Sequence, residues 1–241
     1  MRRLLLFAAA AAALGAIAIA AAVIVWRLRS DDPDLATEAP PIPTAARPSA
    51  SPGAGADAPR PSLPEGVRRF VISPSESTVK YVVEETLRGL PATAVGTTSA
   101  ITGEIYLTEA GLYKDLPSKF TVDLRTLRSD ESMRDNFIRQ NTLQAGRYPF
   151  AEFVVESIDG FPVEYVEATQ VSLTLTGTLK IKDVSRPVSF AVLARQQGGT
   201  LTATADTDFK MTDFGISPPE VVVARAKDQV HLQVVLVARE A

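Results

Sequence analysis

The sequence contains no cysteine and only one histidine among its 241 residues. The lack of cysteine excludes disulfides, thiolate nucleophiles, cysteine-ligated metals and a lipid-modified cysteine. One histidine without cysteine also argues against a transition-metal site, which needs several such ligands. His231 alternates with Leu232 and Val234, so we interpret it as an outward-facing strand residue rather than a catalytic or metal-binding one.

Recognisable catalytic motifs are absent as well. There is no glycine-rich phosphate loop and no nucleophile elbow. Glu84 and Glu85 occupy neighbouring strand positions and point to opposite faces, so they cannot act together as acid and base. Asp206 and Asp208 share a face opposite the apolar one and are interpreted as solvated. We therefore predict a protein that is not an enzyme and that needs no cofactor or metal.

Neither sign of charge dominates the chain. It has 25 Lys and Arg residues against 28 Asp and Glu residues, a net charge of −3. Proteins that bind nucleic acid usually carry a basic patch or stripe, and none is present here. We predict no nucleic-acid partner, and the composition does not determine an oligomeric state.

A long hydrophobic run occurs near the N-terminus. Residues 4–26 are uninterrupted by charge and are long enough to cross a bilayer core of roughly 30 Å. The small residues at 18–22 precede further apolar residues, which favours an uncleaved anchor, and a cleavable signal peptide is the alternative. We predict residues 1–29 as an N-terminal membrane anchor or signal segment. The acidic cluster that follows then favours an extracytoplasmic globular domain, periplasmic or on the cell surface.

Proline is concentrated in the next segment. Residues 30–66 contain nine of the seventeen prolines, with Ala, Ser and Gly between them and few large apolar residues. Such a composition buries too little surface to fold, so we predict a disordered, semi-extended linker. It leads into a folded domain at residues 67–241.

Alternating apolar and polar residues recur throughout this domain. The clearest example is residues 171–181, in which Leu173, Leu175, Leu179 and Ile181 share one face. The connections between such runs are too short for crossover helices, so neighbouring strands should be antiparallel. Eight or more such strands form a barrel or a sandwich. Long strands with mixed large and small inward residues favour the barrel, with room for a ligand.

The inward parity of the strands identifies a candidate lining for this barrel. The predicted ligand-binding residues are Val79, Tyr81, Val83, Ile101, Ile105, Phe120, Val122, Phe137, Phe153, Val155, Leu175, Leu179, Phe190, Val192, Phe209, Leu232 and Val234.

One short helix is predicted between two strands within residues 120–153. Ser129 or Asp130 would form its N-cap. Met133 and Phe137 share a face, so we expect the helix to close one end of the barrel with both side chains inward. Its charged residues fit either a solvated helix or a charged rim that binds the polar head of an amphiphile.

Several segments, in order, resemble the YceI-like family. They are FVISPSESTV at 70–79, AVG at 94–96 with ITGEI at 101–105, VDLRTLRSD at 122–130 with RDNFI at 134–138, YPFAEF at 148–153, LTGTLKIKDVSRPV at 175–188 and DFGI at 213–216. The resemblance implies an extended antiparallel lipocalin-like β-barrel with an elongated apolar cavity. It also implies a polyisoprenoid lipid or quinone-like ligand and an exported location. Glu76 replaces a histidine often found in the opening turn of the family, and no catalytic residues are implied.

Two functions of different classes follow. The first is binding, sequestering or carrying an isoprenoid-type lipid, either polyprenol or quinone-like, in the barrel on the exported side of a membrane. The alternative is a non-enzymatic cell-envelope interaction or scaffold module whose barrel is filled by its own side chains. A continuous internal cavity would count against the second.

Overall fold

The computed structural model describes residues 33–43 and 63–241. Residues 35–241 form one compact unit. In the described part of the chain, no helix is long and apolar enough to span a membrane. The predicted anchor at residues 1–29, and most of the predicted linker, lie outside the described residues.

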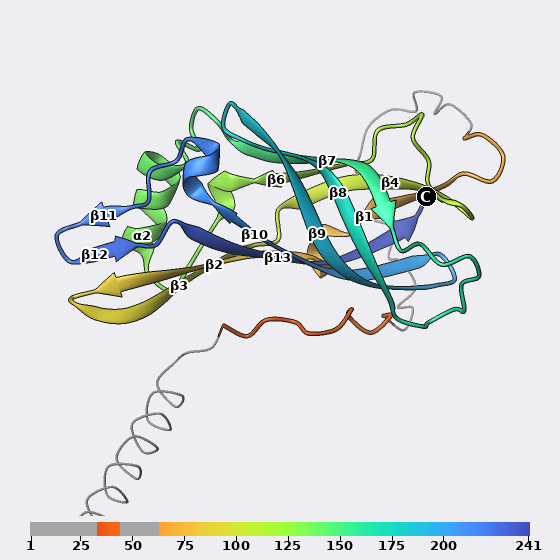
Figure 1. Cartoon of the computed structure of the whole chain (residues 1–241), viewed down its shortest axis with the longest axis horizontal. Helices are drawn as coiled ribbons and strands as arrows, with labels where there is room; N and C mark the ends of the chain where they lie inside the picture. The colour runs from red at the N-terminus through yellow and green to blue at the C-terminus, as the bar shows by residue number, and fades with distance from the viewer. Residues whose placement is uncertain (1–32, 44–62) are drawn as a thin grey trace, which may run out of the picture. The chain divides into compact units, whose positions relative to one another are not determined.

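The described residues contain thirteen strands, most of them joined by short turns, with a longer helical segment between β6 and β7 (Figure 1). The strands are β1 (Arg68–Ile72), β2 (Thr78–Leu87), β3 (Leu90–Thr98), β4 (Ile101–Thr108), β5 (Gly111–Leu112), β6 (Lys119–Asp123), β7 (Phe150–Asp159), β8 (Val171–Ile181), β9 (Val184–Gln197), β10 (Thr200–Lys210), β11 (Glu220–Val221), β12 (Ala224–Ala226) and β13 (Gln229–Glu240). The helical elements are η1 (Pro74–Glu76), η2 (Leu124–Thr126), α2 (Ser132–Phe137), the π-helical turn η3 (Ile138–Thr142) and η4 (Met211–Phe214).

Eight of these strands close into a ring. Its order is β1-β4-β6-β7-β8-β9-β10-β13, and β13 pairs back to β1, every pairing being antiparallel. Closure leaves no exposed edge in the ring, which protects such a sheet from pairing with other chains. The predicted all-β antiparallel barrel with one short helix is confirmed, whereas the transmembrane helix predicted before it falls on residues not described.

A second group of strands extends the wall at one end of the barrel. β2 also pairs with β13, and it carries β3 on one edge and β12 on the other. Thr97 of β3 and Arg128 exchange backbone N–H···O=C bonds of 2.7 and 3.0 Å, which join this group to the loop after β6. We call this end, with the β2–β3 turn, the β11–β12 turn and α2, the rim end. The opposite end, at the β9–β10 turn, is the far end.

Glycine is required where β7 and β8 approach most closely. Gly177 pairs with Val155, and a Cβ atom at Gly177 would lie 2.1 Å from the carbonyl oxygen of Val154. The register of β7 shifts directly beyond this point, between Val155 and Ser157. The bulge and the missing side chain together let the two strands bend, as sharply curved barrels need.

The predicted short helix is present as α2, but its cap differs from the prediction. Glu131, not Ser129 or Asp130, is the N-cap, and its carboxylate accepts a 3.1 Å hydrogen bond from the N–H of Met133. Ser129 instead donates from its N–H and hydroxyl to Asp135, each at 2.7 Å. The side chain of Asp135 thus competes for Ser129 and shifts the helix start, which the local sequence did not reveal.

Part of the predicted linker lies against the outside of the barrel. Residues 36–40, which we call the strap, run along β10 and β13. Ala36 and the side-chain amide of Gln233 exchange two hydrogen bonds of 2.8 and 3.0 Å. The hydroxyl of Thr204 donates to the carbonyl of Glu38 at 2.7 Å.

The strap continues in the same way towards the far end. The hydroxyl of Thr202 donates to the carbonyl of Pro40 at 2.8 Å, and the N–H of Ala39 donates to Gln170 at 3.0 Å. Thr202 and Ala39 are almost completely buried. For residues 36–40 the structure therefore differs from the predicted disordered linker, because distant polar side chains supply partners that composition alone does not show.

Candidate ligand cavity

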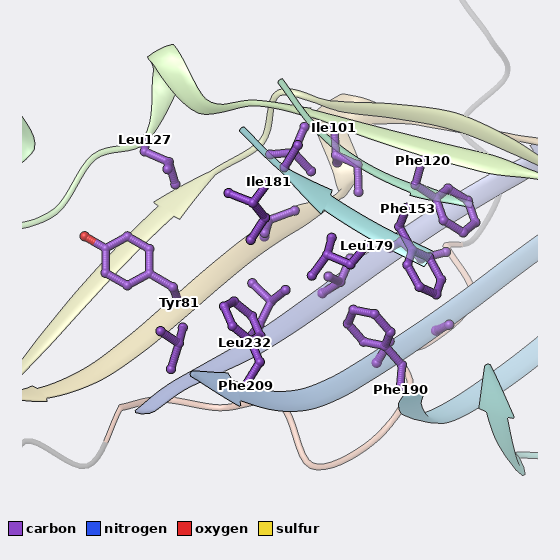
Figure 2. Close-up of a pocket in the computed structure, with 18 of the residues that line it drawn as sticks. Tyr81, Ile101, Phe120, Leu127, Phe153, Leu179, Ile181, Phe190, Phe209 and Leu232 are labelled. Carbon is purple, nitrogen blue, oxygen red and sulfur yellow. The ribbon is translucent and has the colours of Figure 1, made fainter. Parts of the chain in front are cut away.

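A cavity of about 1370 Å³ lies inside the barrel. This exceeds the roughly 300–1,000 Å³ typical of sites for drug-sized ligands. Its wall consists largely of aliphatic and aromatic side chains from the barrel strands, which converge on the interior in Figure 2. β10 alone has 11 residues, which corresponds to about 36 Å of strand. The interior can therefore enclose a long apolar molecule.

The structure places sixteen of the seventeen predicted lining residues in the cavity wall. Tyr81, Phe120 and Phe190 are among those visible in Figure 2. Strand parity alone was sufficient to place these three side chains in the wall, because successive strand side chains point to opposite faces. Their contact with a ligand stays a prediction.

Val155 is the exception. It is buried but belongs to the packed core together with Phe153 and Phe190, whose rings meet edge to face with centroids 5.0 Å apart. The register shift directly after Val155 reverses the parity of β7, so Ile158 rather than Ser157 is the next wall residue. A bulge of this kind leaves no clear mark in the sequence.

Several wall residues were not predicted. Ile181 follows the same parity as Leu179, so the strand pattern could have identified it. Leu127 comes from the non-periodic segment after η2, where the sequence holds no such signal. Ala203 and Ala205 are buried wall residues whose small side chains leave the interior open.

Polar groups gather in the cavity wall at the rim end. Arg134 of α2 lies 3.2 Å from Glu85 of β2 and also pairs with Asp130. Tyr81 lies deeper, and burial raises the pKa of its hydroxyl to about 12, with smaller contributions from the surrounding charges. Tyr81 is therefore neutral at physiological pH and can donate a hydrogen bond. The cavity thus combines an apolar interior with polar side chains at both ends, since Arg68, Glu167 and Gln196 line it at the far end.

The two predicted inward residues of α2 differ in their surroundings. Phe137 is partly buried and lines the cavity. Met133 is 76% exposed and lies at the cavity mouth, so the prediction that it packs inward is wrong. With only six residues, α2 does not extend far enough over the opening to bury both side chains.

His231 and Glu76 both lie outside the cavity wall. His231 lies 3.1 Å from Asp208 and 3.3 Å from Asp206. Glu76 connects the turn after β1 to the end of β13 by a two-pronged pair with Arg239. The contacts of His231 join β13 to β10, and the Glu76–Arg239 pair joins η1 to β13. A structural role therefore accounts for both residues.

The Glu76–Arg239 pair predicts a pH dependence of stability. Hydrogen bonds from Arg239, and then from Ser73, lower the pKa of Glu76 to about 2. Because the folded-state pKa lies below the unfolded-state value, the stabilisation is present above pH ~4.3 and is lost as the pH falls towards about 2. The pair is exposed, so we expect at most about 1 kcal/mol. Glu76→Gln should remove this part of the acid sensitivity.

Thermal unfolding followed by circular dichroism across this pH range measures the effect. The exposed Glu164→Gln variant provides the control and should retain the wild-type pH profile. Equal acid sensitivity of Glu76→Gln and the wild type would contradict the assignment.

Comparison with known proteins places this barrel in a family. The model of the YceI-like domain matches residues 70–238, well over half of the chain. The chain belongs to the YceI-like family. A comparison with curated proteins found no match.

Solved structures share the fold of this YceI-like domain. Burkholderia cenocepacia BcnA is 19% identical, with a TM-score of 0.55 over 69% of this chain and 98% of its own. A polyisoprenoid binding domain from Saccharophagus degradans is 12% identical, with a TM-score of 0.55 over 71% of this chain and 98% of its own. At these identities the likeness shows the fold alone.

Proposed function

We propose that the barrel binds an isoprenoid-type amphipathic lipid, a polyprenol or a quinone-like molecule, and sequesters or carries it. The observation that carries this proposal is the apolar cavity of about 1370 Å³. Burying apolar surface contributes roughly 25 cal/mol per Å², so a long chain in this cavity gains ample affinity. Family membership and the fold shared with a polyisoprenoid binding domain support the same ligand class.

The arrangement of polar groups suggests how such a ligand would lie. Its tail would follow the apolar interior, and its head would lie near Tyr81, Glu85 and Arg134 at the rim end. A hydroxyl or carbonyl head can accept hydrogen bonds from Arg134 and Tyr81 without needing a charge of its own. A neutral head therefore suits this cluster better than a free phosphate beside Glu85.

We further propose a binding rather than an enzymatic role, performed on the exported side of a membrane. The apolar run at residues 4–26 supports anchoring, because its length suits a bilayer-spanning helix. The alternative scaffold function requires a barrel filled by its own side chains. The size of the cavity counts against that alternative.

Lipid extraction tests the proposal directly. The full chain, purified in mild detergent, is extracted with organic solvent and the extract is analysed by mass spectrometry. We expect a polyprenol or quinone in a fixed ratio to protein, or uptake of added polyprenol to one molecule per barrel. A protein that is empty and takes up neither compound would refute the proposal.

A charge in the cavity wall should release the ligand. Phe137→Asp places a carboxylate where the wall of the cavity is apolar, and burying an unpaired charge is costly. We expect ligand dissociation at least about tenfold faster, which corresponds to roughly 1.4 kcal/mol. Transfer of a fluorescent polyprenol analogue to excess acceptor vesicles measures this rate.

Asn136→Asp is the matched control for this variant. It adds the same charge to α2 at an exposed position, where Asn136 already accepts a hydrogen bond from Arg139. Dissociation from this control should equal that of the wild type. Equal rates for all three proteins would show that Phe137 does not contact the ligand.

A further inference from the structure

Two hairpin turns lie side by side at the rim end. The N–H of Arg88, in the β2–β3 turn, donates a 2.7 Å hydrogen bond to the carbonyl of Val223, in the β11–β12 turn. Figure 1 shows these two hairpins projecting beside α2. Hairpin turns usually carry glycine, asparagine, aspartate or proline, because these residues suit the backbone and are well solvated.

The β2–β3 turn, Arg88-Gly89, follows this preference, whereas the β11–β12 turn consists of Val222 and Val223. Val222 is fully exposed, and Leu90, directly after the first turn, is 69% exposed. Together with exposed Met133 on α2 they form an apolar surface, which we call the rim patch: Leu87, Leu90, Met133, Val221, Val222 and Val223. Single exposed apolar residues are ordinary, but a group of six at one end marks an interaction surface.

The rim patch is continuous with the ligand cavity. Five of its members, all except Val222, also line the cavity mouth. Among the charged side chains nearby, Arg225 pairs with Glu220 and Lys227 pairs with Glu84, and Arg88 lies exposed at the tip of the β2–β3 turn. The surface therefore suits an apolar partner rather than one of strong charge. An isoprenoid ligand that enters here from water would expose its whole tail, whereas one that enters from a bilayer would not.

The direction in which the strap runs along the barrel also favours docking at the rim end. Ala36 lies beside Gln233, which pairs across the sheet with Lys80 near the start of β2. Pro40 lies beside Thr202, nearer the far end, so the strap approaches from the side of the rim. From Lys80 to the tip at Leu87, the strand covers about 23 Å.

The chain before the strap is long enough to reach past the rim. Ala36 lies ten residue steps after Trp26, the end of the apolar run, and ten extended steps span up to about 33–36 Å. This reach exceeds the roughly 23 Å between Gln233 and the rim tip. A barrel whose residues 4–26 are inserted in a bilayer can therefore bring its rim patch to the lipid surface without releasing the strap.

We propose that the rim patch docks onto the surface of a lipid bilayer, so that the cavity opens directly into the lipid. The inference rests on the proposed lipid-binding function and adds the route by which the ligand enters. Val222 and Leu90 insert among the lipid head groups, and the ligand tail passes between the hairpins and α2 into the cavity. Docking is driven by apolar burial and therefore depends little on salt.

The lack of native cysteine allows a site-specific test on the full chain. Val222→Cys is labelled with an environment-sensitive fluorophore, and the protein is reconstituted in phosphatidylcholine vesicles containing a spin-labelled quencher lipid. Val166→Cys is the matched control, because Val166 is also an exposed valine and lies outside the cavity wall. It lies in the β7–β8 loop, which is held at the far end by hydrogen bonds of Tyr165 to Gln196.

We expect quenching of the probe at position 222 to be at least threefold stronger than at position 166, and nearly unchanged at high salt. Equal quenching at both positions, or stronger quenching at position 166, would overturn the proposal. Strong quenching that disappears at high salt would also overturn it, because electrostatic attraction would then drive docking.

A second variant separates docking from ligand binding. Val222 lies outside the cavity wall, so Val222→Asp should leave polyprenol binding in detergent unchanged. Uptake of polyprenol from vesicles should become at least tenfold slower, whereas Val166→Asp, also outside the cavity wall, should behave as the wild type. Unchanged uptake by Val222→Asp would refute docking while the binding function stands. Rim quenching in a protein that binds no polyprenol would refute the binding function and leave the docking surface established.

Discussion

Replacing Ala203 with tryptophan should reduce the affinity for a long polyprenol more than tenfold. Ala203 is buried in the cavity wall, and the larger ring would project into open space rather than into packed neighbours. Excluding about three CH₂ groups of the ligand at roughly 0.8 kcal/mol each costs about 2.4 kcal/mol. A shorter isoprenoid, which does not reach this level of the barrel, should bind as before.

Titration of the purified protein with polyprenols of increasing length measures this effect. Ala191→Trp is the matched control, because Ala191 is exposed and lies on the outer side of the neighbouring strand β9. It should bind every chain length as the wild type does. If Ala203→Trp also bound all lengths equally well, the ligand would not occupy this part of the cavity.

Replacing Phe214 with alanine should reduce the free energy of unfolding by about 3–5 kcal/mol. Phe214 is only 1% exposed, and its ring meets that of Phe209 edge to face, with centroids 5.1 Å apart. η4 holds Phe214 in the core beside Met211. The substitution loses both the transfer free energy of the ring and the contacts around the resulting void. Because Phe209 lines the cavity, ligand affinity should fall as well.

Urea denaturation followed by circular dichroism measures this loss. Phe150→Ala is the control, since Phe150 is 45% exposed and its removal should cost less than about 1 kcal/mol. A loss of similar size in both variants would show that Phe214 is not a central part of the core.

The strand pattern was sufficient for much of the fold and of the cavity wall. Residues 171–181 were predicted as one long strand, and β8 has those bounds. Phe120, Phe190 and Leu232 were placed on the wall from parity alone, and the structure places them there. Alternation can be recognised in a sequence because each strand side chain points either to the interior of the barrel or to its outside.

Local signals were less reliable at the ends of elements. The N-cap of α2 is Glu131, while Ser129 binds Asp135, and the bulge after Val155 reverses the parity of β7 so that Ile158 lines the cavity. In both cases, contacts with residues elsewhere in the fold decide the local arrangement.

By itself, the sequence determined an antiparallel barrel, its inward residues, the short helix and the absence of cysteine chemistry. Only the tertiary structure decided that the interior is hollow, since a cavity depends on how far apart opposite walls lie. It also decided that residues 36–40 bind β10 and β13, through partners more than 150 residues away in the chain. The rim patch likewise unites Leu90, Met133 and Val222, which approach one another only when the barrel closes. Periodicity records which side a residue faces, whereas distances between remote segments arise only from closure of the sheet.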